Sequence, residues 1–256
     1  MKTILIKCGG SVIDQLTEDF FISLKELMEN GYKLVFVHGG GPDINQMLEL
    51  YQVKPEFHEG LRKTTEETME IVEMVLSGKT NRKLVHLLTK HGLNGIGING
   101  TDDHCIEASI IDEEKLGLVG NVTSVNSKLI SYFLQENYIP VITPLGATKD
   151  GKKLNINADY VASAVAKSLN VEQCLFVTDV PGVIIDGELR QVLAQEEIEY
   201  YIEEGQISGG MIPKVTSALS ALQSGLNSVM IISGKNKFYN GKEIQGTKIV
   251  EKVGVL

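Results

Sequence analysis

The chain has 256 residues, 43% of them hydrophobic, which is enough for one large domain or two small ones with a well-buried core. Its formal net charge of -9 argues against nucleic acid as a partner, because an acidic surface repels a phosphate backbone. No apolar run approaches the roughly 18 residues that a membrane-spanning helix needs, and the apolar run at the amino terminus is too short for a signal peptide.

Cysteine usage indicates a reducing compartment. Cys8, Cys105 and Cys174 are odd in number and widely spaced, and they form no CxxC pair. This pattern fits the cytosol better than a disulfide framework. We therefore expect a cytoplasmic protein.

The first ninety residues predict alternating strands and helices. Buried strands are expected at the apolar runs 3–7 and 33–38, and apolar residues at helical spacing follow each of them. Thr64 and Glu67 are typical of a capping box, which predicts a helix over 65–77. The alternation favours an α/β fold with a largely parallel sheet.

The segment 93–126 differs from the rest of the chain. Its short alternating runs and polar turns predict antiparallel strands or hairpins. "GIGING", at 95–100, matches the GxGxxG dinucleotide fingerprint, but no helix pattern follows it, so no dinucleotide site is expected. "DDHC", at 102–105, resembles a set of metal ligands, but four adjacent residues do not easily converge on one ion. A polar turn is expected there.

Regular alternation returns after residue 126. The expected elements are a helix at 127–137, a strand at 139–145, a helix at 158–169, a strand at 174–180, helices at 195–204 and 214–224, and a strand at 228–233. No low-complexity linker and no repeat of fixed period interrupts the chain. One continuous fold with two lobes is expected, with a soft boundary near residue 170.

Two glycine-rich loops follow the first two predicted strands. "KCGGS" occupies 7–11 and "HGGGP" occupies 38–42. Ligands of open α/β sheets lie at the carboxyl ends of strands, and backbone N–H groups without side chains can converge on an anion. The loops therefore predict an anionic ligand, and Lys7 is expected to contact a phosphate. The alternative is a pair of tight turns and a strand-end lysine that reaches solvent.

Polar residues of the second half point to the same chemistry. Asn155, Asn157 and Asp159 alternate, which on a strand would aim all three side chains at one site. Alternatively, Asn157 or Asp159 caps the following helix. "ISGGMIPK", at 207–214, repeats the order of glycine loop and helix, and it places Lys214 in the first helical turn, where an anion would bind.

Six motifs, in order over the whole chain, resemble the amino-acid kinase family. They are "KCGGS", "HGGGP", "GLR", "NINAD", "TDVPGV" and "GGMIPK". "NINAD" together with "GLR" and "GGMIPK" is similar to the branch of the family that phosphorylates N-acetyl-L-glutamate. The resemblance implies a single domain over 1–256, folded as an open αβα sandwich with a mainly parallel central sheet.

The resemblance also implies a reaction, in which ATP and N-acetyl-L-glutamate give ADP and N-acetyl-L-glutamyl 5-phosphate, a step of arginine biosynthesis. An N-lobe of about 1–170 would bind the acyl substrate and a C-lobe of about 171–256 would bind ATP. Mg²⁺ would be held mainly by the nucleotide phosphates, so no dedicated metal site is expected.

Carried over motif by motif, the resemblance implies roles for individual residues. Lys7 and Lys214 would stabilise the transition state, and Asp159 would organise the two lysines. Expected contacts of the acyl substrate are Gly40, Gly41, Arg62 and Asn155. Expected phosphate and nucleotide contacts are Gly9, Gly10, Gly39, Thr178, Asp179, Val180, Gly182, Gly209, Gly210 and Met211.

Two other functions stay open at the level of the sequence: a sister kinase acting on another carboxylate or carbamate, and a non-catalytic nucleotide-binding regulator. Arg62 and Asn155 favour a substrate with a second carboxylate, and the two lysines favour catalysis. Hexameric, arginine-inhibited relatives carry an additional amino-terminal helix, whereas this sequence begins within three residues of its first strand. We expect a homodimer without arginine feedback.

Overall fold

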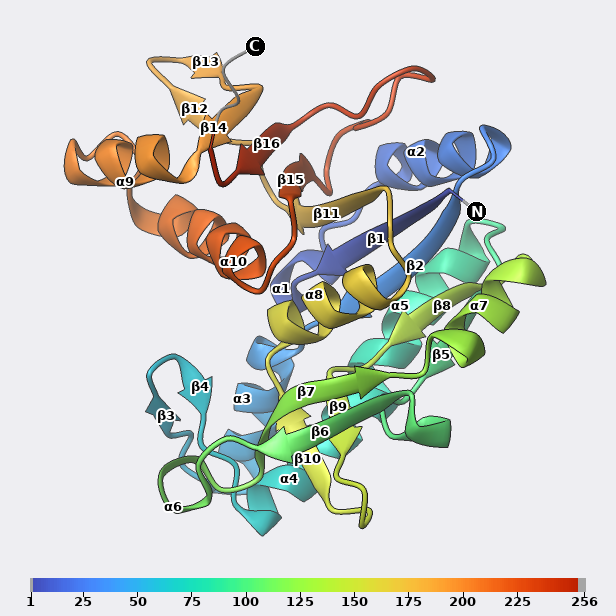
Figure 1. The fold of residues 1–256 in the computed structure, drawn as a ribbon, viewed down its shortest axis with the longest axis vertical. Coiled ribbons are helices and arrows are strands. Elements are labelled where there is room, and N and C mark those ends of the chain that lie inside the picture. The colour runs from blue at the N-terminus through green and yellow to red at the C-terminus, as the bar shows by residue number, and fades with distance from the viewer. Residues whose placement is uncertain (1, 253–256) are drawn as a thin grey trace.

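The structure, a computed structural model, describes residues 2–252 and has an eight-stranded sheet at its centre (Figure 1). The strand order is β14-β16-β15-β11-β1-β2-β8-β5. The strands are β1 (Thr3–Cys8), β2 (Lys33–His38), β5 (Gly95–Ile98), β8 (Ile139–Ile142), β11 (Gln173–Thr178), β14 (Val192–Ala194), β15 (Ser228–Ser233) and β16 (Thr247–Val250). The strands from β15 to β5 run parallel, whereas β16 is antiparallel to β15. The predicted α/β fold with a mainly parallel sheet is confirmed.

Alternate residues of the central strands enter two separate cores, one on each face of the sheet. In β1, Leu5 packs into one core, while Ile4 and Ile6 pack into the other. Helices on the first face are α7 (Ser127–Gln135), α8 (Ala158–Ser168), α9 (Gln195–Glu203) and α10 (Ile212–Gln223). Helices on the second face are α1 (Gly10–Ile13), α2 (Glu18–Glu29) and α5 (Asn81–Lys90). The molecule is therefore a sandwich of helices, sheet and helices.

A small closed barrel of strands lies to one side of the central sheet, in the lower part of Figure 1. Its strands are β6 (Ile106–Ile110), β7 (Val119–Val125), β9 (Leu145–Ala147) and β10 (Lys153–Ile156). Around it lie α3 (Gly41–Leu50), the hairpin β3 (Phe57–His58) and β4 (Leu61–Arg62), α4 (Glu66–Glu73), the π-helix η1 (Met74–Thr80), the 3-10 helix η2 (Asp102–His104) and α6 (Glu113–Leu116). Further along the chain, the pair β12 (Ile184–Ile185) and β13 (Glu188–Leu189) follows β11, and the 3-10 helix η3 (Gly209–Met211) precedes α10.

Some local predictions are wrong. The segment 93–126 is not made only of hairpins, because β5 joins the central sheet parallel to β8, although β6 and β7 are antiparallel as expected. The predicted strand 139–145 is two strands, since β8 ends at Ile142 and β9 begins at Leu145. These errors share a cause: short apolar runs do not say which sheet a strand joins.

The amino terminus of the helix expected over 65–77 is also corrected. Thr65 is its cap, with its hydroxyl accepting a hydrogen bond from the Thr68 N–H at 3.2 Å. Thr64 instead pairs with the β6–β7 connection, where its N–H donates to the Leu116 carbonyl at 2.8 Å. The helix changes to π geometry from Met74 to Thr80 before α5 begins.

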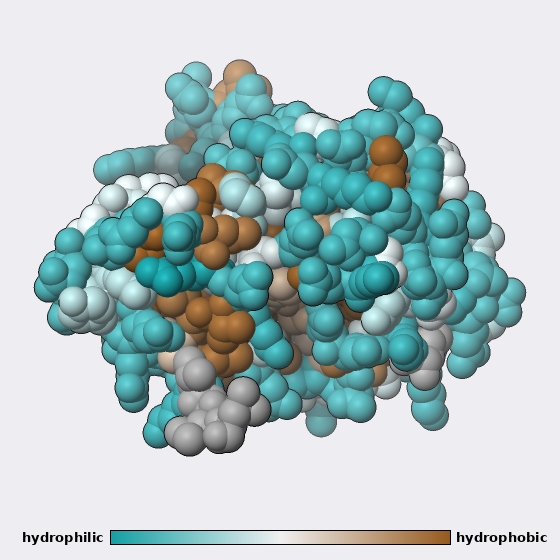
Figure 2. Space-filling model, turned by 90° about the horizontal axis from the view of Figure 1, so that it is seen from above, coloured by the Kyte–Doolittle hydropathy of each residue, from teal (hydrophilic) through white to brown (hydrophobic). Residues whose placement is uncertain are grey.

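The surface is mainly polar (Figure 2), as expected for a fold whose apolar residues lie in the core. Figure 2 shows a face that is largely hydrophilic, with hydrophobic side chains gathered in a few places. None of the helices between residues 2 and 252 is both long and apolar enough to cross a membrane.

Candidate active site

The two glycine loops lie side by side at the carboxyl ends of β1 and β2. These strands are neighbours, with Cys8 opposite His38, and the Gly39 N–H donates to the Cys8 carbonyl at 2.9 Å. A Cβ added to Gly10 would lie 2.8 Å from the Cα of Gly40, so a side chain there would force the loops apart. The loops are thus brought together, as their positions after two strands predict.

The second loop leads directly into the helix α3. Gly40 is the N-cap of α3, and Pro42 lies in the first turn, where its missing N–H costs no hydrogen bond within the helix. The first N–H groups of a helix have no partner within the helix, and they carry the positive end of its dipole. This end of α3 favours an anion.

Lys7 forms an ion pair next to these loops. Its ammonium lies 2.7 Å from Oδ1 of Asp159 and 5.1 Å from the centroid of the Phe176 ring. Each of the two charged side chains is only 16% exposed. A pair this far removed from water is sensitive to loss of either partner, because the remaining charge would be uncompensated.

Asp159 lies in the first turn of α8 and not on a strand. β10 ends at Ile156, and Asn157 caps the helix by accepting a hydrogen bond from the Asp159 N–H at 2.7 Å. The alternating-strand interpretation of Asn155, Asn157 and Asp159 is therefore wrong, and the capping alternative is confirmed for Asn157. All three residues nevertheless line one cavity, because the chain turns into the helix there.

Lys214 lies in the first turn of α10, as predicted, and pairs with Asp179. The ammonium of Lys214 is 2.6 Å from Oδ1 of Asp179. The hydrogen bond from Lys214 holds the pKa of the Asp179 carboxyl below its usual value. In this structure each lysine thus has its own carboxylate, with Asp159 beside Lys7 and Asp179 beside Lys214.

Two cavities meet at Lys7. One, of about 370 Å³, is also lined by Gly9, Thr178, Asp179, Gly210 and Lys214. The other, of about 240 Å³, is also lined by Gly39, Gly40, Gly41, Arg62, Asn155 and Asp159. Gly10, Val180, Gly182, Gly209 and Met211 line neither cavity. One ammonium therefore faces both spaces.

Arg62 brings a second cation to the smaller cavity. It ends β4, is 9% exposed, and lies with its guanidinium carbon 4.7 Å from the centroid of the Phe57 ring. Its Nη2 donates to Oδ1 of Asn45 at 2.6 Å, whereas its buried Nη1 has no hydrogen-bond partner among residues 2–252. Burial lowers the pKa of the guanidinium, which still stays charged. A buried cationic donor without a partner calls for an anion.

Asn155 is held beside Arg62. Its Nδ2 donates to the Thr64 hydroxyl at 3.0 Å, and that hydroxyl donates to the Arg62 carbonyl at 2.8 Å. Thr64 therefore matters for the site, because its hydroxyl joins β10 to the hairpin that carries Arg62.

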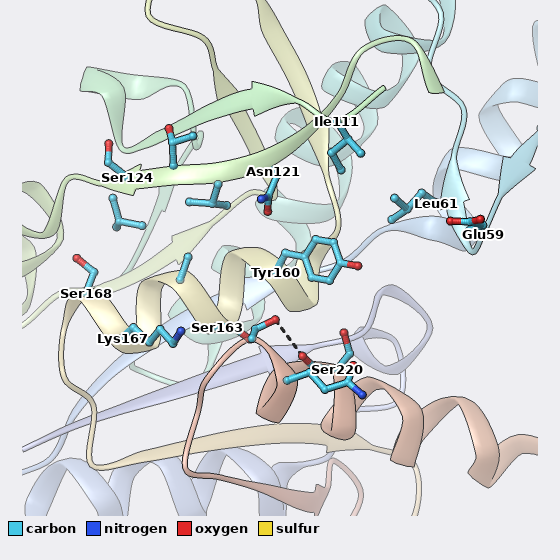
Figure 3. Close-up of a pocket in the computed structure, with 16 residues that line it drawn as sticks. Glu59, Leu61, Ile111, Asn121, Ser124, Tyr160, Ser163, Lys167, Ser168 and Ser220 are labelled. Carbon is cyan, nitrogen blue, oxygen red and sulfur yellow. Dashed lines mark hydrogen bonds between the residues drawn. The ribbon is translucent and has the colours of Figure 1, made fainter. Parts of the chain in front are cut away.

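A larger hollow lies elsewhere, between β7, α8 and α10. It measures about 950 Å³, and Figure 3 shows Tyr160, Ser163 and Lys167 along α8 with Asn121 and Ser124 of β7 across from them. None of the residues predicted to bind ligands lines this groove. We therefore identify the candidate active site by the charged side chains that face the two cavities at Lys7, and not by cavity size.

The segments "GIGING" and "DDHC" form ordinary secondary structure. The strand β5 covers most of "GIGING", and "DDHC" forms the 3-10 turn η2 and its carboxyl-terminal cap. Within residues 2–252 no three His, Cys, Asp or Glu side chains gather in a way that would hold a metal ion.

His38 was not among the predicted site residues, yet its side chain contacts the second glycine loop. It is fully buried, with Nε2 3.2 Å from Nδ2 of Asn81 and Nδ1 3.1 Å from the Gly39 carbonyl oxygen. Because an amide NH₂ only donates, Nε2 must accept, and the proton is on Nδ1, which donates to Gly39. Burial lowers the pKa of His38 to about 4.

This burial predicts a pH-dependent stability. The unfolded chain binds a proton at His38 near the ordinary pKa of 6.5, whereas the folded chain does so only near 4, so acid favours unfolding. The free energy of unfolding is expected to fall by up to about 3 kcal/mol from this residue between these pH values. Urea unfolding at a series of pH values measures it. His38→Gln should flatten the dependence and His86→Gln, on an exposed side chain, should not. An equally steep curve for His38→Gln would contradict the assignment.

Comparison with known proteins agrees with the fold and the order of motifs. The sequence model of the amino acid kinase family matches residues 2–233. An acetylglutamate kinase of Geobacillus sp. (strain WCH70) is 51% identical over 254 residues, which is 99% of each chain. The acetylglutamate kinase of Bacillus subtilis (strain 168) is 48% identical over 250 residues, covering 98% of this chain and 97% of that protein.

A solved structure gives the same result. The crystal structure of smu.665 from Streptococcus mutans UA159 superposes with a TM-score of 0.82 at 34% identity, covering 98% of this chain and 99% of the other. Sequence and structure thus agree over nearly the whole length. The chain belongs to the amino acid kinase family, in its acetylglutamate kinase branch.

Proposed function

We propose that the protein transfers the γ-phosphoryl group of ATP to the side-chain carboxylate of N-acetyl-L-glutamate, giving N-acetyl-L-glutamyl 5-phosphate. The observation that carries this proposal is that Lys7 lines both cavities of the site. A cation between two binding spaces suits a group that moves from one to the other. The names of the relatives that are similar over the full length support the same acceptor.

The smaller cavity is the proposed acceptor site. The unpartnered Nη1 of Arg62 is suited to the α-carboxylate of the substrate, because a guanidinium binds carboxylates through charge-assisted hydrogen bonds. Asn155 offers an amide close to this position. The backbone N–H groups of Gly40 and Gly41, at the start of α3, are suited to the oxygens at the reacting end.

The larger of the two cavities is the proposed nucleotide site, with Lys214, Asp179, Thr178 and Gly210 on its wall. In this scheme the N-lobe, about 1–170, holds the acyl substrate and the C-lobe, about 171–256, holds ATP. Val180, Gly182, Gly209 and Met211 would contact the nucleotide beyond the described cavity, and Gly9, Gly10 and Gly39 would line the phosphate path.

Phosphoryl transfer needs correctly positioned reactants and neutralisation of negative charge more than it needs proton transfer. The acceptor carboxylate is already a nucleophile at neutral pH, so no general base is needed. Charge spreads over the oxygens of the transferring group, and Lys7 and Lys214 would neutralise it from two sides. Asp159 and Asp179 would keep the two ammonium groups in place and reduce their mutual repulsion.

In this arrangement Mg²⁺ would bind together with the nucleotide. Asp159 and Asp179, the carboxylates beside the two lysines, are each engaged in an ion pair. We therefore propose that the nucleotide phosphates and water hold most of the metal, as this ion prefers. When bound, Mg²⁺ would supply further neutralisation of phosphate charge.

The proposed reaction is tested by trapping the acyl phosphate with hydroxylamine. With Mg²⁺ and ATP, the hydroxamate is expected from N-acetyl-L-glutamate and not from L-glutamate. Hydroxamate from L-glutamate alone would instead indicate a sister kinase. Binding of ATP without any hydroxamate would contradict catalysis.

We further propose a cytoplasmic homodimer. The three cysteines are free and buried, which suits a reducing compartment. Light scattering after gel filtration is expected to give about 56 kDa, twice the 28.0 kDa of one chain. A mass of six chains, or inhibition by arginine, would contradict the expected assembly and its lack of feedback.

A further inference from the structure

The hydroxyl of Ser217 lies between Asp159 and Lys7. Its Oγ donates to Oδ2 of Asp159 at 2.5 Å and accepts from Nζ of Lys7 at 3.3 Å. The three residues come from α10, α8 and β1, and Ser217 is 58 positions from Asp159 and 210 from Lys7. No local pattern in the sequence indicates this contact.

The direction of these hydrogen bonds is fixed by chemistry. An ionised carboxylate only accepts and an ammonium only donates, so the single proton of Ser217 must point to Asp159 and its lone pair to Lys7. Charged groups on both sides strengthen such hydrogen bonds. The hydroxyl therefore has one orientation.

Ser217 also determines how Asp159 is held. Oδ1 of Asp159 faces Lys7 at 2.7 Å but has no aligned hydrogen-bond donor among residues 2–252. Oδ2 accepts the short hydrogen bond from Ser217. The rotation of the carboxylate is therefore set from the side of α10.

Lys7 in turn has a limited number of donors. An ammonium has three N–H groups, and one of them donates to Ser217, while the ion pair with Asp159 holds the ammonium from a second side. The remaining N–H groups are available to a ligand in the adjoining cavities. The hydrogen bond and the ion pair together restrict how the ammonium can turn. Without Ser217 the ammonium could turn about its contact with Asp159.

We propose that Ser217 is a positioning residue for phosphoryl transfer, which holds the ammonium of Lys7 so that its remaining N–H groups face the transferring group. Lys214 and Ser217 are three residues apart on α10 and so share a face of that helix. The helix that carries Lys214 thereby also holds Asp159, the counter-ion of Lys7. The two ammonium groups therefore keep fixed positions relative to each other. This inference rests on the function proposed above.

The test compares Ser217→Ala with Ser217→Thr and with the control Ser220→Ala, one turn further along α10. Loss of a hydrogen bond between charged groups is expected to lower kcat of Ser217→Ala roughly tenfold. KM for both substrates should change little, because the interaction matters in the transition state. Ser217→Thr keeps the hydroxyl and should recover most of the rate, and Ser220→Ala should match the parent. Unfolding midpoints check that all variants are folded.

A crystal structure of Ser217→Ala supplies a readout that does not depend on activity. The carboxylate of Asp159 is expected to rotate and to leave its contact with Lys7. An unchanged pair in that crystal, or a parental kcat in Ser217→Ala, overturns the inference while leaving the proposed function intact. Absence of acyl phosphate from the parent protein would instead count against the function, and the crystal structure would then decide the role of Ser217.

Discussion

Lys7→Ala is expected to lower kcat by about 10²–10³-fold, the usual effect of removing one preorganised charge donor from a transition state. The ammonium lies beside two glycine loops and lines both cavities, so it is placed to act on the group in transit. KM for either substrate should change much less than kcat. Steady-state kinetics with the hydroxylamine assay measures both constants.

Two further variants make this result specific. Lys7→Met keeps the length of the side chain and removes its charge, so it should be as slow as Lys7→Ala. Lys2→Ala removes an exposed lysine just before the same strand, and it should retain the parental kcat. Removing Lys7 leaves the carboxylate of Asp159 without its counter-ion, so circular dichroism must first show that the variants are folded. A parental kcat in folded Lys7→Met would show that the charge is not used.

Arg62→Ala is expected to raise KM for N-acetyl-L-glutamate about 10–100-fold, because a charged hydrogen-bonded pair is lost. The buried Nη1 has no partner within residues 2–252, so a carboxylate of the ligand is the proposed one. KM for ATP should stay near its parental value, since Arg62 does not line the cavity proposed for the nucleotide.

The neighbouring residue gives a matched control. Lys63 is half-exposed and pairs with Glu56 at 3.0 Å, so Lys63→Ala removes a cation next to the same hairpin without touching the cavity. Its KM for both substrates should match that of the parent. Arg62→Lys should recover only part of the affinity, because an ammonium lacks the planar fork of a guanidinium. An unchanged KM in Arg62→Ala would favour an acceptor without a second carboxylate.

Local patterns in the sequence were sufficient for the main elements. β2 and β15 occupy the predicted ranges 33–38 and 228–233, since long apolar runs between polar turns favour buried parallel strands. The convergence of the two glycine loops also followed from the sequence, because parallel neighbouring strands end at the same edge of a sheet.

Contacts between distant segments could not be predicted in this way. Nothing near Lys214 in the sequence indicates its pairing with Asp179. The sequence shows Ser217 only as a polar residue in a helix, and its contact with Asp159 depends on the packing of α10 against α8. The role of Thr64 was misassigned for the same reason, since its partners Leu116 and Asn155 lie far along the chain. Periodicity reports which face of an element is buried, but not what lies opposite it.

Lys7 is proposed to act on the phosphoryl group where the two cavities meet. The most direct measurement is a crystal structure of the parent protein with ADP, aluminium fluoride, Mg²⁺ and N-acetyl-L-glutamate. We expect the fluoride between the nucleotide and the side-chain carboxylate, hydrogen-bonded to Lys7 and Lys214, with the α-carboxylate on Arg62. Both ligands bound without contact between Lys7 and the fluoride would contradict this proposal.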